Sequence, residues 1–185
     1  MTVSARGWVT RMLPVLAGMM LGGLLMLVGL AQAGRLAGKD PEAVVALAQQ
    51  MQVLHRKVDL QLRAKDVAGA IEALEDARTL PWPDRERGGD LGMELRHDVY
   101  GRLVRLRLDH PDVAPIEPDA LLALVDEGLG PEPDAVDPNP FTARLMALRG
   151  ESLEGQGRDD EALTAYERAL DINRTLLERE LGDVP

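Results

Sequence analysis

Apolar residues recur every three or four positions from residue 40 onwards, which is the spacing of one face of an α-helix. The first such stripe consists of Val44, Leu47, Met51, Leu54 and Val58. Asp40-Pro41-Glu42 precedes it and is typical of a helix start, because it combines a capping oxygen, a proline whose missing N–H needs no partner and an acid in the first turn. The pattern therefore predicts an amphipathic helix that begins at about residue 41.

The same periodicity predicts five more helices. Asp66 is placed to cap the second helix, and Leu80-Pro81-Trp82-Pro83 ends it, because proline lacks a backbone donor and restricts the residue before it. The predicted spans are about 67–79, 91–109, 119–129, 141–154 and 159–180. The proline-rich residues 131–140 are predicted as a linker. No alternating strand pattern occurs, so the predicted fold is all-α, with three antiparallel helix pairs.

The N-terminal segment, residues 1–33, has a different pattern. It contains Arg6 and Arg11 but no acid, and an apolar run follows from Met12 to Ala33. This run is closer in length to the roughly 17–25 residues of a membrane-spanning helix than to the about 7–15 of a cleavable signal. Residues 1–33 are therefore predicted to be a membrane anchor. The alternative is a secretory signal peptide, because Ala31-Gln32-Ala33 matches a small-x-small cleavage site.

The short, acid-free N-terminal side of the apolar run favours an orientation with the N-terminus inside. Residues 34–185 would then lie outside the cytoplasm as the second predicted unit, a helical domain. We therefore expect a single-pass protein of a bacterial inner membrane with its C-terminal domain in the periplasm. If the signal is cleaved instead, the domain is exported to the periplasm.

Composition and charge narrow the function classes. Aromatic residues make up only 3% of the chain, which fits a helical body better than a β-sandwich or barrel. The net charge is −10, and it becomes −12 for residues 34–185, because residues 1–33 contribute two arginines and no acid. Such a field repels phosphate backbones, so nucleic-acid binding is not expected.

The residues that usually carry chemistry are sparse. The chain has no Cys, and Ser152 is the single serine after residue 33; its neighbours are acids rather than a histidine. Two small polar clusters, His55 with Asp59 and the segment 109–112, offer too few ligands for a metal site. We therefore predict no catalytic residues, no metal and no cofactor. A hydrolase based on Ser152 or on a His/Asp metal site is the least favoured interpretation.

The last predicted helix pair has a characteristic spacing of small and large residues. The residues that carry it are Gly150, Leu153, Gly157, Ala162, Tyr166 and Ala169. Small residues allow two helices to approach closely, while the large ones fill the volume beside them. Over residues 141–174, this spacing resembles the helix–turn–helix unit of a tetratricopeptide repeat. Met146, Arg149 and Arg174 depart from the pattern, because they stand where that family usually has Trp, Leu and Pro.

Two earlier segments repeat this spacing less closely. The first pair has Ala70, Leu74 and Ala77 within residues 44–80, and the middle pair has Leu121, Val125 and Gly128 within residues 94–130. Insertions at 80–92 and 130–140 separate the copies. The predicted fold is therefore a short array of stacked, tetratricopeptide-like helix pairs behind one hydrophobic segment. An irregular helical bundle with one such hairpin is the alternative.

The resemblance implies a function in protein–protein interaction. Proteins of this family hold a peptide or a partner helix against a concave wall built by the first helix of each pair. By the family pattern, the groove-facing residues of the last first helix are Arg144, Ala147, Glu151 and Glu154. Charges of both signs suit a polar peptide. We expect a non-catalytic adaptor or assembly factor of the cell envelope, with a permanent structural subunit of a larger membrane complex as the alternative.

Overall fold

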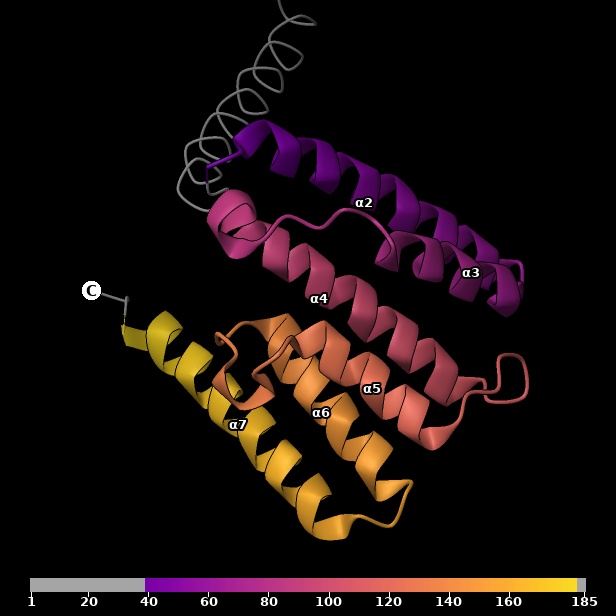
Figure 1. Ribbon diagram of the computed structural model, residues 1–185, viewed down its shortest axis with the longest axis vertical. Helices are drawn as coiled ribbons and strands as arrows, with labels where there is room; N and C mark the ends of the chain where they lie inside the picture. The colour runs from indigo at the N-terminus through magenta and orange to yellow at the C-terminus, as the bar shows by residue number, and fades with distance from the viewer. Residues whose placement is uncertain (1–38, 183–185) are drawn as a thin grey trace, which may run out of the picture.

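The computed structural model describes residues 39–182, and all of its regular structure is helical. The α-helices are α2 (Pro41–Arg63), α3 (Val67–Arg78), α4 (Arg85–Asp109), α5 (Pro118–Leu129), α6 (Pro140–Glu154) and α7 (Asp159–Gly182) (Figure 1). The prediction of an all-α class is confirmed for this part of the chain. The predicted anchor or signal at 1–33 lies outside the described residues. None of the described helices is long and apolar enough to cross a membrane.

Side-chain caps fix most of the helix starts. The carboxylate of Asp40 accepts a hydrogen bond from the Ala43 backbone N–H, and that of Asp66 accepts one from the Gly69 N–H, at 2.9 Å. At the start of α6, Asn139 and Thr142 form a reciprocal capping box. The two helix starts predicted at Asp40 and Asp66 are therefore confirmed.

Two segments differ from the sequence prediction. Helix α4 has an additional first turn from Arg85, capped by the Asp84 carboxylate through the Arg87 N–H at 2.9 Å, before the helix start predicted near residue 91. Gly89 interrupts this helix with φ +60°, a conformation that glycine adopts without strain. The predicted linker 131–140 also contains a single 3-10 turn, Pro133–Ala135. A proline at the first position of a helical turn removes an N–H that needs no partner there.

The six helices form three antiparallel pairs that stack in chain order. The pairs are α2 with α3, α4 with α5, and α6 with α7. The first helices lie side by side, since α4 contacts both α2 and α6. The second helix of each pair also contacts the next pair, α3 against α4 and α5 against α6. This is the predicted short array of helix pairs, seen from one side in Figure 1.

One hydrophobic core runs through the whole array. Met51, Leu74, Leu103 and Leu145 are almost completely buried, and they belong to a cluster with members from all six helices. A second, smaller cluster joins α5 to the last pair and consists of Leu122, Leu153, Ala162 and Ala165. The apolar stripes predicted from the sequence are thus buried between helices, both within pairs and between them.

Glycines allow the helices of two pairs to approach closely. A Cβ atom added at Gly150 on α6 would lie 2.6 Å from the Tyr166 ring on α7. In the middle pair the roles are exchanged, because a Cβ at Gly128 on α5 would lie 2.8 Å from Tyr100 on α4. The close approach predicted at Gly150 is therefore confirmed, and a larger side chain there requires the tyrosine to move.

We expect Gly150→Leu to lower the free energy of unfolding by about 1–3 kcal/mol, because the added side chain overpacks the contact with Tyr166. Urea unfolding of a chain that begins at Gly34 measures this cost. In a Tyr166→Ala background the same substitution should cost clearly less, since the ring is gone. Equal costs in the two backgrounds would show that Gly150 does not pack against Tyr166.

Candidate functional site

Ion pairs connect the inner sides of the three first helices. Asp98 on α4 is the central residue: its carboxylate lies 3.2 Å from His55 Nε2 on α2 and 3.9 Å from Arg144 Nη1 on α6. Arg102, one turn further along α4, lies 3.4 Å from Asp98 and 3.5 Å from Asp59 on α2. These contacts join helices that are far apart in the sequence.

A second link joins α4 to α6. Arg105 Nη2 donates to Glu151 Oε1 at 2.6 Å, and this hydrogen bond raises the pKa of the guanidinium. We call the inner surface of the three first helices the wall. Its polar residues are His55, Asp59, Asp98, Arg102, Arg105, Arg144 and Glu151. Burial and then the nearby Arg102 lower the pKa of His55, so this residue is neutral at pH 7.

The wall contains a hollow of about 240 Å³ between α2, α4 and α6. Its apolar lining comes from Val58, Leu62 and Leu106. Its charged lining comes from Arg102, Arg105 and Arg144, whose side chains are all partly exposed. Such a surface offers hydrogen-bond donors beside an apolar floor, which suits a polar peptide with an apolar side chain.

The four residues predicted to face the groove are not equivalent in the structure. Arg144 and Glu151 lie on the wall, against α4. Ala147 is half-buried and packs against the core. Glu154 is exposed and accepts a hydrogen bond from the Tyr166 hydroxyl at 2.8 Å, so it contacts the second helix of its own pair. Burial and this bond raise the pKa of Tyr166 to about 12. That these four residues bind a partner stays a prediction.

Sequence reasoning missed the wall residues of α2 and α4. It considered His55 and Asp59 only as a weak metal pair, whereas in the structure His55 lies 3.2 Å from Asp98 and Asp59 forms an ion pair with Arg102, both on α4. The sequence signal that would have found them is the four-residue spacing of polar residues that His55 with Asp59 shares with Asp98 and Arg102. Among residues 39–182, no group of three or more His, Cys, Asp or Glu side chains is arranged to hold a metal ion.

The Ser152 hydroxyl is buried inside the array. It donates a hydrogen bond to the Leu148 carbonyl oxygen at 2.9 Å, within α6. Serine within a helix commonly donates its hydroxyl in this way to the carbonyl oxygen four residues earlier.

A larger hollow of about 640 Å³ lies between α4, the 131–139 segment and the end of α7. His97 lines it, although only 4% of this residue is exposed, and neither ring nitrogen has a hydrogen-bond partner. Burial, followed by the nearby charge of Arg96, lowers the pKa of His97 to about 4. Burial and the neighbouring Asp90 raise the pKa of Glu94 on the same hollow.

These values predict an acid-sensitive core. The unfolded chain protonates His97 near its ordinary pKa of 6.5, whereas the folded chain keeps it neutral down to about pH 4. Because the unfolded state binds the extra proton, stability falls as the pH drops from about 6.5 to 4, by up to about 3 kcal/mol. His97→Met should remove this part of the pH dependence of stability. The unfolding free energies of the unsubstituted chain and of His97→Met are measured in urea at pH 7 and at pH 4. The difference between them should change by about 3 kcal/mol between the two pH values, and a constant difference contradicts the prediction.

Comparisons with known proteins point to the last helix pair. Residues 143–176 match the family model described as tetratricopeptide repeat, which covers most of α6 and α7. Neither a curated protein nor a solved structure matches the chain significantly. The family match and the all-helical array together support a tetratricopeptide-like helical repeat protein. Such a repeat indicates a role in protein–protein interaction.

Proposed function

We propose that this protein is a non-catalytic adaptor or assembly factor that binds a partner peptide or helix on the wall. The observation that carries the proposal is the alignment of α2, α4 and α6, which brings apolar side chains of α2 and α4 and arginines of α4 and α6 around one hollow. The tetratricopeptide match in the last pair supports the same interpretation, because repeats of this family are generally interaction modules rather than enzymes.

The chemistry of the wall defines the class of partner. Arg102, Arg105 and Arg144 surround the hollow, but Asp59, Asp98 and Glu151 lie within ion-pair distance of them. The local charge is therefore balanced rather than strongly positive. A partner segment with polar side chains of both signs and one apolar side chain fits this surface better than a polyanion does.

The location is proposed from the sequence alone. The apolar run Met12–Ala33 anchors the chain in the inner membrane of a bacterium and places the helix pairs in the periplasm. Cleavage after Ala33 would release the same helix pairs into the periplasm.

A permanent subunit of a larger membrane complex is the second candidate. It is favoured by one specific observation, a row of exposed leucines on the outer side of α7: Leu163, Leu170, Leu177 and Leu181. Exposed apolar rows of this kind are typical of surfaces that another protein covers.

Replacing Arg144, Glu151 and Glu154 together with Ala should weaken capture of the partner. The measurement is the set of proteins that co-purify with the tagged chain from detergent-solubilised membranes. Helix content and melting temperature should change little, because exposed ion pairs contribute only about 0–1 kcal/mol each.

A matched control replaces Arg63, Glu72 and Glu132 with Ala. These three residues are exposed, their replacement changes the net charge by the same amount, and none belongs to the wall. The control should retain every partner. If the variant without Arg144, Glu151 and Glu154 captures its partners as well as the unsubstituted chain does, the binding surface lies elsewhere than on the wall.

The anchor prediction has its own test. Full-length chain should remain in the membrane pellet after an alkaline carbonate wash, because a spanning apolar helix is held by the hydrocarbon core rather than by charge. The N-terminus of the mature chain is read by mass spectrometry. A chain that starts at Gly34 selects the cleaved signal instead.

A further inference from the structure

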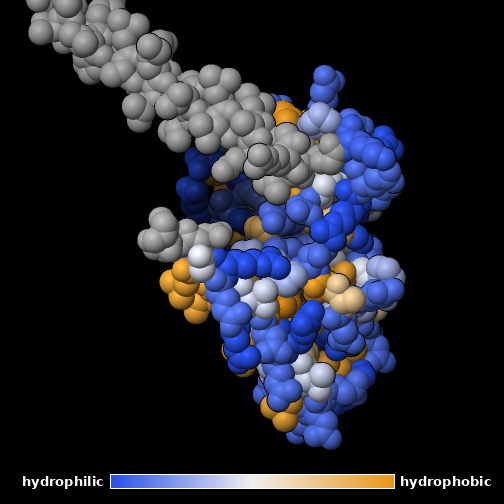
Figure 2. Space-filling view, turned by 90° about the vertical axis from the view of Figure 1, so that its left-hand side faces the viewer, coloured by the Kyte–Doolittle hydropathy of each residue, from blue (hydrophilic) through white to orange (hydrophobic). Residues whose placement is uncertain are grey.

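The exposed apolar side chains of the array gather at its two ends. Among the described residues, all the large exposed hydrophobic side chains except Val113 lie on α2 and α7, the first and last helices. On α2 they are Val45, Val53 and Leu60, and on α7 they are Leu163, Leu170, Leu177 and Leu181. Figure 2 views the molecule from the side on which α7 lies in Figure 1, and it shows hydrophobic side chains between hydrophilic ones over the lower half.

The exposed face of α7 corresponds to a buried face of α5. When these two second helices are aligned at their first residues, Leu163 falls at the position of Leu122, and Leu170 at that of Leu129. Leu122 and Leu129 are only 9% and 4% exposed, and Leu122 packs against Leu153, Ala162 and Ala165 of the following pair, whereas Leu163 and Leu170 are 60% and 63% exposed. Helix α7 thus has the face that holds a following pair, but no pair follows it among the described residues.

The exposed face of α2 corresponds in the same way to a buried face of α6. When the first and last pairs are aligned at the starts of α3 and α7, Val53 falls at the position of Leu145 and Leu60 at that of Ser152. Leu145 and Ser152 are 0% and 5% exposed on a helix that contacts α5 of the preceding pair, while Val53 is 71% exposed. Val53 also borders an apolar hollow of about 260 Å³ between α2 and α3.

A recurring type of ion pair marks each internal junction between pairs. At the junction of α5 and α6, Arg149 Nε donates to Asp126 Oδ1 at 2.8 Å. At the junction of α3 and α4, Glu75, which is equivalent to Asp126, accepts from Arg107 at 2.6 Å. The equivalent acid on α7 is Glu167, and the residue of α2 equivalent to Arg149 is Lys57. Both are exposed. One end of the array therefore carries the acid, and the other end the base, of an ion pair like that between Asp126 and Arg149.

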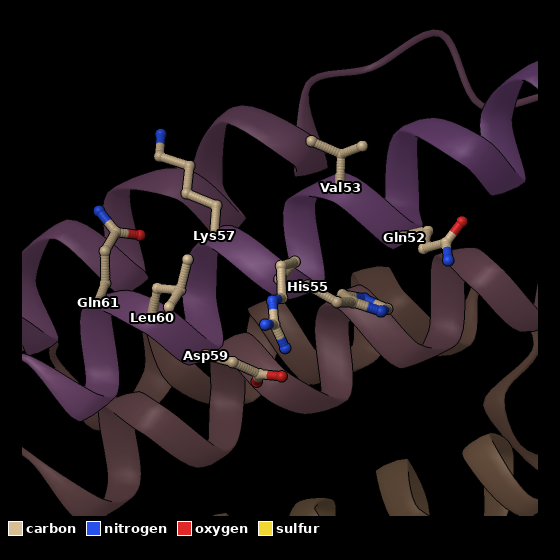
Figure 3. Close-up of a pocket in the computed structure, with 8 residues that line it drawn as sticks. Gln52, Val53, His55, Lys57, Asp59, Leu60 and Gln61 are labelled. Carbon is tan, nitrogen blue, oxygen red and sulfur yellow. The ribbon is translucent and has the colours of Figure 1, made fainter.

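We propose that copies of this protein associate head to tail, with α7 of one copy packed antiparallel on α2 of the next. A single register brings these residues together: Leu163 meets Leu60 of the second copy, Leu170 meets Val53, Leu177 meets Val45, and Glu167 meets Lys57. Val53 and Lys57 project from one side of α2 and Asp59 from the opposite side, so this junction leaves the wall open (Figure 3). The hollow of about 880 Å³ along the middle of α2 runs beside these residues.

The symmetry of this contact has a direct consequence. The two surfaces are different, so each copy that binds leaves another α2 and another α7 face uncovered. Such a heterologous interface forms a ring if the rotation closes and an open chain if it does not. Successive copies would extend the array of helix pairs, and with it the wall that we propose as the partner-binding surface. The association stands on the end helices and does not depend on what the wall binds.

The first test uses chemical cross-linking of the full chain. Two copies with different affinity tags are produced together, one with Lys57→Cys and the other with Glu167→Cys. The chain has no other Cys, so these are the only thiols present. A short bis-maleimide should link the two copies in membranes. Neither variant should link to itself when it is produced alone.

Two results would overturn the proposal. A cross-link of the Glu167→Cys chain to itself, without linkage to the Lys57→Cys chain, would show that two α7 helices pair with each other. Absence of any linkage, with both copies present in the same membranes, would show that the copies do not associate through these faces.

The second test compares variants by co-purification of the two tagged copies. Leu163→Glu with Leu170→Glu should reduce recovery of the second copy more than tenfold, because charged side chains then meet an apolar face. Val113→Glu is the matched control, since Val113 is an exposed apolar residue away from both ends. It should leave recovery unchanged, and circular dichroism should show equal helix content in all variants.

Exchange of the charges tests the register. Lys57→Glu should weaken association roughly two- to fivefold, the range expected for one exposed ion pair. Adding Glu167→Lys to the same chain should restore recovery, because every junction then carries the pair in reversed order. Weakening by both changes without restoration would show that Lys57 and Glu167 do not meet, and would overturn the proposed register.

Discussion

Between residues 39 and 182, no helix pair buries its apolar surface by itself, and this constraint shapes the whole array. Leu122 on α5 illustrates it, because its buried neighbours are Leu153, Ala162 and Ala165 of the next pair. The larger core cluster likewise takes members from all six described helices. Neighbouring pairs must therefore stack, and the stability of each pair depends on the one beside it.

The same stacking creates the wall. Once α2, α4 and α6 lie side by side, the polar residues at their inner sides come within ion-pair distance, as Asp98 does with His55 and Arg144. Partly exposed pairs of this kind add little to stability compared with the core. They lie on one continuous surface, around a hollow partly lined by apolar side chains, and this is the surface that we propose binds a partner.

At each end of the array, one helix face has no neighbouring pair that covers it. A second helix is buried on the side that faces the next pair, and a first helix on the side that faces the previous one. At α7 and α2 these sides are exposed, and they keep both the apolar residues and the charges that the internal junctions use. This explains why Leu170 is exposed while the equivalent Leu129 is buried. The chain therefore combines a polar inner surface with two apolar end surfaces, and the end surfaces do not include the wall.

Most of the local structure of residues 39–182 follows from short sequence signals. Caps such as Asp40 and Asp66 fixed helix starts, apolar stripes fixed the buried faces, and Gly150 marked the close helix contact, because each of these signals acts over a short stretch of chain. The sequence also predicted the three helix pairs, but the register in which the pairs stack, and the side chains that meet across them, came from the tertiary structure. The pairing of Arg105 with Glu151 joins side chains 46 positions apart, and no local pattern encodes such a distance, because it follows from how whole pairs pack on one another.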